Sequence, residues 1–395
     1  MRELSRLTMT TTDTCSVLSL HLICGKITHV AQVKDFAELG ARIRLFRQGA
    51  NLDQETLARE CASRGQHLDR TAISRIETGD RKVSALELSV LAEIVGVSFV
   101  DLVSAPEPSV LAARKPIAEE STSQEREDFL AGVEIDRAWR DLCQLRDYHL
   151  IEAVELPFGG HGLATREEAR ELAQKTRDFL KVGDAPLGSM TDVAAELGLW
   201  CRTTQVAVDG LSFSPEIGLG VALVGQGLDP GRRRATVAHE IGHHISGDTY
   251  DASSHFSSAK QAEELIEVFA AELLLPSRVL EELRCPTRAD LVRLAAEYRV
   301  SWSLIVQSTD TAKVDLSKVE RKTTPVDEDF YRAVGSKPEE DMVPPGFAKK
   351  WVQACVRAVD EDFISRRRAQ EMTSGLIKAG VAVADGLEGP SWRME

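Results

Sequence analysis

The 395-residue sequence lacks any long apolar run, and no window approaches the roughly 18 apolar residues that a membrane-spanning helix needs. It has little cysteine: the seven cysteines are odd in number, widely scattered and without a CxxC pair. That pattern argues against a disulfide framework or a zinc ribbon and favours reduced thiols in a cytoplasmic protein. Basic residues are also in deficit, with 48 Lys and Arg against 62 Asp and Glu, so non-specific coating of a polyanion is disfavoured.

The chain has the composition of an ordinary globular protein, with 43% hydrophobic and 28% charged residues, and its length suits two or three domains. Residues 1–34 hold one short apolar stretch, without a basic run leading into it or a clear cleavage site, so we expect a leader outside the folded part and not a signal peptide. Residues 105–128 combine three prolines, several Ser and Thr and dense charge. This composition predicts an exposed linker between domains.

Hydrophobic periodicity divides the remainder into three parts. Residues 35–104 show helical spacing throughout, and residues 129–310 add two apolar runs, at 199–206 and 217–224, that predict strands. Residues 311–395 have the pattern of a helical carboxy-terminal extension. The expected fold class is therefore mostly α with a small sheet: an all-α five-helix domain, then an α+β domain and a helical tail.

Two segments of the amino-terminal part carry a specific fingerprint, Leu52-Asp-Gln-Glu-Thr-Leu-Ala58 followed by Thr71-Ala-Ile-Ser-Arg-Ile-Glu-Thr-Gly79. Together they resemble a Cro/repressor-type (XRE family) helix-turn-helix domain. In such domains the second helix enters the major groove by its amino-terminal end. The resemblance implies a double-stranded DNA operator as partner, and it implies contacts to that DNA from Gln54, Arg70, Thr71, Ser74 and Arg75.

Other residues support the resemblance in part. Asp69 is placed to cap the second helix, and Arg47 and Glu77 match an ion pair of the family. The turn at 61–68 is longer than the family's usual turn. Nine Arg and Lys against six Asp and Glu between residues 42 and 82 give only a modest local excess of positive charge. The alternative is a helical protein-interaction module that has lost DNA binding.

The motif His239-Glu240-Ile-Gly-His243 carries the clearest chemistry. Its two histidines are one helical turn apart, so both imidazoles can bind one zinc ion, and Glu240 is placed to take a proton from water. The surrounding run is amphipathic and ends at Gly247, which makes a helix credible. Three protein ligands leave a fourth position for water, so a third ligand is required downstream.

The segment Glu263-Glu-Leu-Ile-Glu-Val-Phe-Ala-Ala-Glu-Leu-Leu-Leu-Pro276 follows. With the first motif it resembles the ImmA/IrrE family of gluzincin-like zinc metallopeptidases, and the resemblance puts the third ligand on Glu263. It also implies cleavage of a repressor or similar regulatory protein. Glu267 departs from the family pattern and suits a supporting partner, an alternative ligand or a perturbing charge. The alternative for His239, Glu240 and His243 is a site that folds without metal.

The surroundings of this motif carry less specific signals. His244, Tyr250 and His255 are expected to be structural or exposed and not catalytic. A substrate could add as an extended strand beside the 217–224 edge. The clusters at 232–234 and 366–368 have the composition of solvated basic surfaces, because no aromatic residues interleave with them.

Three functions fit this organisation. The first is a cytoplasmic transcriptional regulator that carries a zinc-dependent peptidase domain acting on a repressor or other regulatory protein. The second is a transcription factor whose peptidase-like domain senses a metal or ligand and cleaves nothing, and the third is an antitoxin-like module that holds a partner protein. No membrane partner is expected, and operator symmetry would favour a homodimer.

Overall fold

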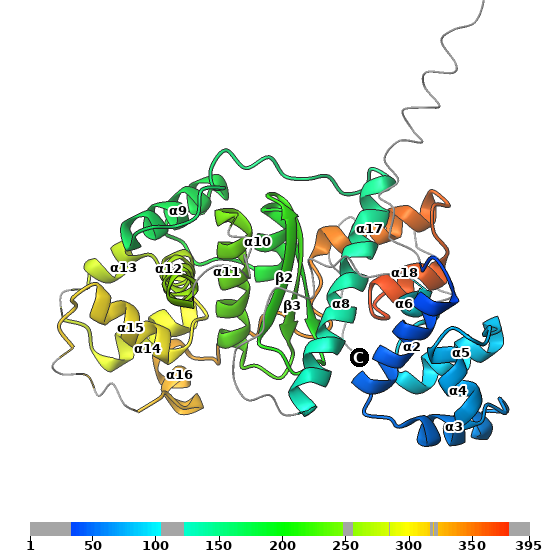
Figure 1. Cartoon of the computed structure of the whole chain (residues 1–395). Coiled ribbons are helices and arrows are strands. Elements are labelled where there is room, and N and C mark those ends of the chain that lie inside the picture. Colours follow the sequence, from blue (N-terminus) through cyan, green and yellow to red (C-terminus); the bar gives the residue numbers. More distant parts are fainter. Residues whose placement is uncertain are drawn as a thin grey trace, which may run out of the picture.

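The computed structural model describes residues 33–103, 122–247, 256–283, 285–316, 319 and 323–378, with the side chains of 122–129 and 256–260 left out (Figure 1). Residues 1–32 of the predicted leader and 105–121 of the predicted linker lie outside these residues, whereas residues 122–128, predicted as linker, form the start of the helix Thr122–Asp147. None of the helices in these ranges combines the length and the apolar character that crossing a membrane requires. The expected fold class, mostly α with one small sheet, is confirmed.

Five short helices form the amino-terminal domain, as predicted. They are α2 (Phe36–Gly49), α3 (Gln54–Ser63), α4 (Arg70–Glu77), α5 (Ala85–Val95) and α6 (Phe99–Val103). Side-chain caps start the helices: the Asp53 carboxylate accepts from the Thr56 amide, and the Asp69 carboxylate accepts from the Ala72 amide at 2.6 Å. Their apolar faces meet in one core, in which Leu57 is fully buried.

A three-stranded sheet lies at the centre of the second part of the chain. Its strands are β1 (Leu199–Thr204), β2 (Gly210–Glu216) and β3 (Leu219–Gly225). The order is β1-β3-β2, with β3 parallel to β1 and antiparallel to β2. The predicted strands at 199–206 and 217–224 correspond to β1 and β3, but the expectation that the second forms an edge is wrong. Strand β3 is central and fully buried, and the two edges are β1 and β2; the sequence did not predict β2.

Helices cover both faces of this sheet (Figure 1). On one side lie helices α9 (Arg166–Phe179), α10 (Met190–Glu196), α11 (Pro230–Ser246), α12 (Phe256–Leu274), α13 (Ser277–Glu281), α14 (Arg288–Glu297), α15 (Trp302–Thr311) and α16 (Asp327–Val334). On the other side lie α8 (Thr122–Asp147), α17 (Lys349–Asp360) and α18 (Arg366–Met372). Because both faces are covered, β3 consists entirely of apolar residues and glycine.

Where the structure describes the predicted carboxy-terminal extension, it contains helices α16, α17 and α18 and shares the cores of the sheet domain. Trp351 and Met372 are buried in the same cluster as Leu142 of α8, and the Trp351 indole donates to the Met372 carbonyl at 3.0 Å. Asp341 is buried and pairs with Arg234 of α11. Residues 341–372 are therefore part of the packing that holds the sheet and α11 in place.

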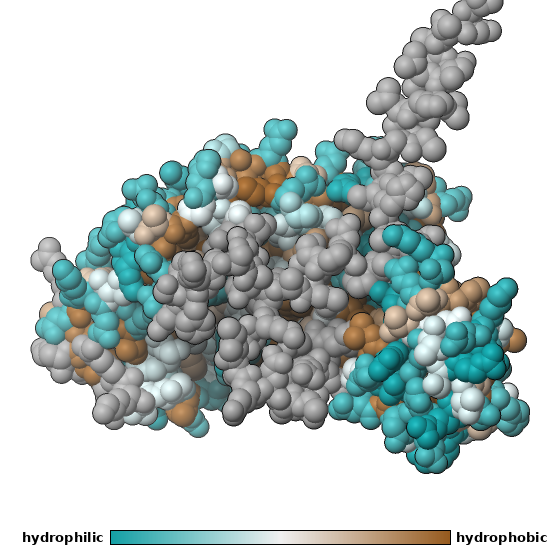
Figure 2. Space-filling view, viewed as in Figure 1, coloured by the Kyte–Doolittle hydropathy of each residue, from teal (hydrophilic) through white to brown (hydrophobic). Residues whose placement is uncertain are grey.

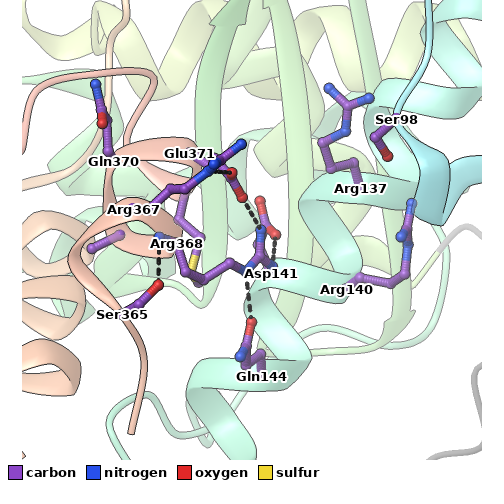
Figure 3. A network of polar contacts seen from close by, with 12 residues as sticks. Ser98, Arg137, Arg140, Asp141, Gln144, Ser365, Arg367, Arg368, Gln370 and Glu371 are labelled. Atoms are coloured by element: carbon purple, nitrogen blue, oxygen red, sulfur yellow. Dashed lines mark hydrogen bonds and ion pairs between the residues drawn. The ribbon is translucent and has the colours of Figure 1, made fainter. Parts of the chain in front are cut away.

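Helix α8 also contacts the amino-terminal domain. Asp101 of α6, 2% exposed, accepts from Arg137 at 2.6 Å and from Arg140 at 2.5 Å. One turn along α8 from Arg137, buried Asp141 pairs with Arg368 of α18 (Figure 3). Helix α8 thus forms ion pairs both with α6 of the amino-terminal domain and with α18 of the carboxy-terminal part.

Candidate metal centre and nucleic-acid interface

Helix α11 positions the two histidines of the HExxH motif. Pro230 occupies its first turn, where no intrahelical donor is needed, and the helix ends at Gly247. His239 and His243 are partly buried, and their Nε2 atoms lie 3.1 Å apart. Both imidazoles therefore point to one spot beside α11, as the spacing predicts.

Helix α12 brings Glu263 to the same spot. Its Oε2 lies 3.1 Å from His239 Nε2, and its Oε1 lies 3.6 Å from His243 Nε2. Helices α11 and α12 come this close because Gly242 has no side chain: a Cβ there would lie 2.9 Å from both Ile266 and Phe269. The close packing of α11 against α12 thus places the Glu263 carboxylate beside the two imidazoles.

The donor set suits a zinc ion. One ligand atom from each of His239, His243 and Glu263 lies within 4.8 Å of the others, and two imidazole nitrogens with one carboxylate form a common zinc ligand set. Hydrogen bonds from His239 and His243 hold the pKa of the Glu263 carboxyl well below its usual range, so the group is an anion. The residues therefore fit the metal that the sequence predicts.

Glu240 faces the sheet beside this cluster. It is 1% exposed, and its Oε2 accepts a hydrogen bond from the Ser212 hydroxyl of β2. Gly210, also on β2, leaves room for the carboxylate, since a Cβ there would lie 2.6 Å from Glu240 Oε1. Sequence reasoning missed both contacts because it did not predict β2, although small residues at 210, 212 and 214 are a recognisable alternation.

His244 is structural, as expected. It is buried; its Nδ1 lies 2.7 Å from the Ser214 hydroxyl, and its Nε2 lies 3.0 Å from the Leu197 carbonyl. Burial lowers the pKa of His244 to about 4, against a smaller opposing effect of the Leu197 carbonyl, so the ring is neutral near pH 7. Tyr250 and His255 lie outside the described residues.

A cleft of about 1050 Å³ opens beside the cluster. His239 and Glu240 line one wall, and Ala270 and Glu267 of α12 line another, with Trp302 further along. Glu267 is exposed, and it is not part of the three-residue ligand group. Glu267 is therefore not placed to bind the metal directly, and its two other proposed roles are those of a supporting partner and of a perturbing charge.

The prediction that residues 232–234 form a solvated basic surface is wrong for two of the three. Arg234 is 1% exposed; its guanidinium donates to the carbonyls of Leu187 and Gly188 and to the carboxylate of Asp341. Arg233 is also buried, and only Arg232 has the expected exposure. The guanidinium of Arg234 is buried because carbonyl and carboxylate acceptors surround it.

In the amino-terminal domain, α4 presents the residues predicted to contact DNA. Arg70, Thr71 and Arg75 are exposed and Ser74 is partly exposed. The surface over α3 and α4 is largely hydrophilic (Figure 2). Gln54 lies at the start of α3, as the resemblance requires.

The Gln54 amide donates to the Glu77 carboxylate at 2.8 Å. The same carboxylate accepts from Arg47 at 2.6 Å, so the expected ion pair is present and almost fully buried. The Gln54 side chain is therefore part of the hydrogen-bond network that joins α2, α3 and α4.

Comparison with known families agrees with both halves of this description. A model of a helix-turn-helix domain matches residues 38–105, and a model of the IrrE N-terminal-like domain matches residues 194–308. The chain is thus a fusion of a helix-turn-helix DNA-binding domain and an IrrE/ImmA-like peptidase domain, in the order that the sequence motifs predict. The two matched ranges include every predicted site residue. No protein in a curated collection matches the chain.

Proposed function

We propose that this protein is a transcriptional regulator of the cytoplasm whose IrrE/ImmA-like domain is a zinc-dependent peptidase that cleaves a repressor or other regulatory protein. The convergence of His239, His243 and Glu263 beside the buried carboxylate of Glu240 carries the proposal. A site that had lost its function would not be expected to keep three ligands and a base in one place at the wall of a cleft of about 1050 Å³.

The chemistry divides among these residues. His239, His243 and Glu263 would hold the zinc ion, which when bound supplies Lewis-acid polarisation of a carbonyl group and acidification of water. Glu240 would take a proton from the attacking water and later release it to the leaving amine. A cleft of this volume suits an extended peptide, and the half-buried edge strand beside the site, β2, is the strand that such a peptide would pair with.

The amino-terminal domain would direct this activity to an operator. Its exposed Arg70, Thr71, Ser74 and Arg75 would enter the major groove with the start of α4, and Gln54 would approach a phosphate. Two copies on a symmetric operator would place two peptidase domains at one DNA site.

The substitution Glu240→Gln tests cleavage. Repressor proteins encoded near the gene are incubated with the purified chain, and fragments are identified by mass spectrometry. We expect wild type to cut at least one of them and Glu240→Gln to cut none, with the same zinc content in both proteins. Glu264→Gln is the matched control, because Glu264 is an exposed neighbour of Glu263 outside the ligand group. Cleavage that survives Glu240→Gln would contradict the mechanism.

The contact between α8 and the DNA-binding domain favours a second candidate, a regulator that senses metal without cleaving. Asp101, Arg137 and Arg140 connect the two domains through buried or half-buried ion pairs, so a change in one domain can reach the other. Zinc bound at His239 and His243, zinc-dependent DNA affinity and no fragments from any tested repressor would favour this candidate over the peptidase.

A further inference from the structure

Strand β2 presents alternate residues to its two sides. Leu211 and Phe213 pack with the cluster on the α8 side, where the Phe213 ring meets Trp139 edge-on with the ring centres 5.2 Å apart. Gly210 and Ser212 face α11 and contact Glu240. The edge strand therefore places one apolar face in the core and one face of small residues against the HExxH helix.

The contacts of Glu240 leave its carboxylate little freedom. Burial disfavours a charged carboxylate unless a donor compensates, and the Ser212 hydroxyl supplies a donor to Oε2. The missing side chain of Gly210 leaves just enough space for Oε1. The carboxylate is thus held against β2 through both oxygens, one by a hydrogen bond and one by close packing.

We propose that Ser212 is a positioning residue for the peptidase reaction, acting through Glu240. This rests on the proposed function. In hydrolysis the water oxygen bonds to the scissile carbonyl carbon, and the water proton passes to Glu240. The proton then goes to the amine nitrogen as the C–N bond breaks. A hydrogen bond from Ser212 to Oε2 fixes the orientation of the carboxylate that takes up this proton, and general-base catalysis depends on such alignment.

The chain offers a matched control two residues along the same face. The Ser214 hydroxyl lies 2.7 Å from Nδ1 of His244, one helical turn beyond Glu240 on α11. Ser214 thus makes the same kind of strand-to-helix contact, but to the structural histidine. Ser212→Ala and Ser214→Ala each remove one such contact, and only Ser212→Ala frees the Glu240 carboxylate.

A stability measurement on the full chain tests the contact without any substrate. Ser212→Ala and Ser214→Ala are each made in wild type and in Glu240→Ala, and thermal midpoints are compared. We expect Ser212→Ala to lower the midpoint in wild type and to leave it nearly unchanged in Glu240→Ala, while Ser214→Ala lowers it equally in both. Equal effects of Ser212→Ala in both backgrounds would overturn the proposed pairing.

Kinetics then test the positioning role. The probe is a peptide library made by digesting a whole-cell lysate, from which the best-cleaved peptide is synthesised. We expect Ser212→Ala to lower kcat by roughly 10- to 100-fold with KM and zinc content unchanged. Ser212→Thr, which keeps the hydroxyl, should recover most of that loss, and Ser214→Ala should keep the wild-type kcat.

The two measurements separate the inference from the function on which it rests. Equal kcat values for Ser212→Ala and Ser214→Ala, or no recovery in Ser212→Thr, would overturn the positioning role while cleavage itself stands. If wild type cleaves neither the library nor any repressor, the proposed peptidase function fails, and with it the role of Ser212 in catalysis. The thermal midpoints would still decide whether Ser212 and Glu240 interact.

Discussion

Replacing Asp101 by Asn should loosen the DNA-binding domain from α8. The Asp101 carboxylate accepts from Arg137, Arg140 and both the amide and the hydroxyl of Ser98. Removing one partner of a buried ion pair costs about 3–5 kcal/mol. The loss here should be smaller, because the Arg137 side chain is 41% exposed and Asn can still accept from Ser98. We therefore expect about 2 kcal/mol, a roughly 30-fold shift toward the undocked arrangement.

Hydrogen–deuterium exchange of the full chain measures this shift. Peptides from α6 and from the contacting part of α8 should exchange faster in Asp101→Asn, up to roughly 30-fold, and peptides from α11 should not change. Ser98→Ala is the matched control, because it removes the hydroxyl contact to Asp101 and leaves both ion pairs intact. If Asp101→Asn and Ser98→Ala change the exchange rates equally, Asp101 stabilises only α6 and does not hold the DNA-binding domain against α8, which would refute the reasoning.

Three further outcomes can be checked. Burial alone would raise the pKa of Asp101, but Arg137 and the other donors lower it overall. The stabilising contribution of Asp101 is therefore present above the ordinary Asp pKa of about 4 and is lost as pH falls through the lower folded value, so the exchange difference between wild type and Asp101→Asn should shrink progressively as pH falls below about 4. Gly210→Ala should displace Glu240, costing about 1–3 kcal/mol in denaturant unfolding and most of the cleavage while zinc stays bound, and unchanged cleavage would contradict the close packing. Arg75→Ala should weaken operator binding by about 1–3 kcal/mol in a fluorescence titration, whereas an equal loss on random DNA would make Arg75 a backbone contact.

Local signals predicted the helices of the amino-terminal domain and the helix that brings His239 and His243 together. The Asp69 cap and the pair of Arg47 and Glu77 follow from spacing within one small domain, and both are present. His239 and His243 lie one turn apart on a helix, and the resemblance to the ImmA/IrrE family, not the spacing of the residues, pointed to Glu263 as their partner. These features depend on neighbours in sequence or on a single helix pair.

Long-range packing decided what the sequence could not predict. Strand β2 contains glycine, serine and proline, so its composition has the character of a loop, and it becomes a strand by pairing with β3. Arg234 has the surface pattern of a basic cluster, yet its partner Asp341 lies 107 residues away. The support of Glu240 by Ser212 depends on both the strand and the helix that faces it, and neither element predicts the contact alone.

Zinc content by elemental mass spectrometry tests the central claim most directly. Protein is purified without a histidine tag as wild type, His239→Ala and Glu264→Gln. We expect about one zinc per chain in wild type and in Glu264→Gln, and only background zinc in well-folded His239→Ala. Background zinc in folded wild type, even after zinc is supplied, would contradict the account and leave a DNA-binding regulator with a metal-free peptidase fold.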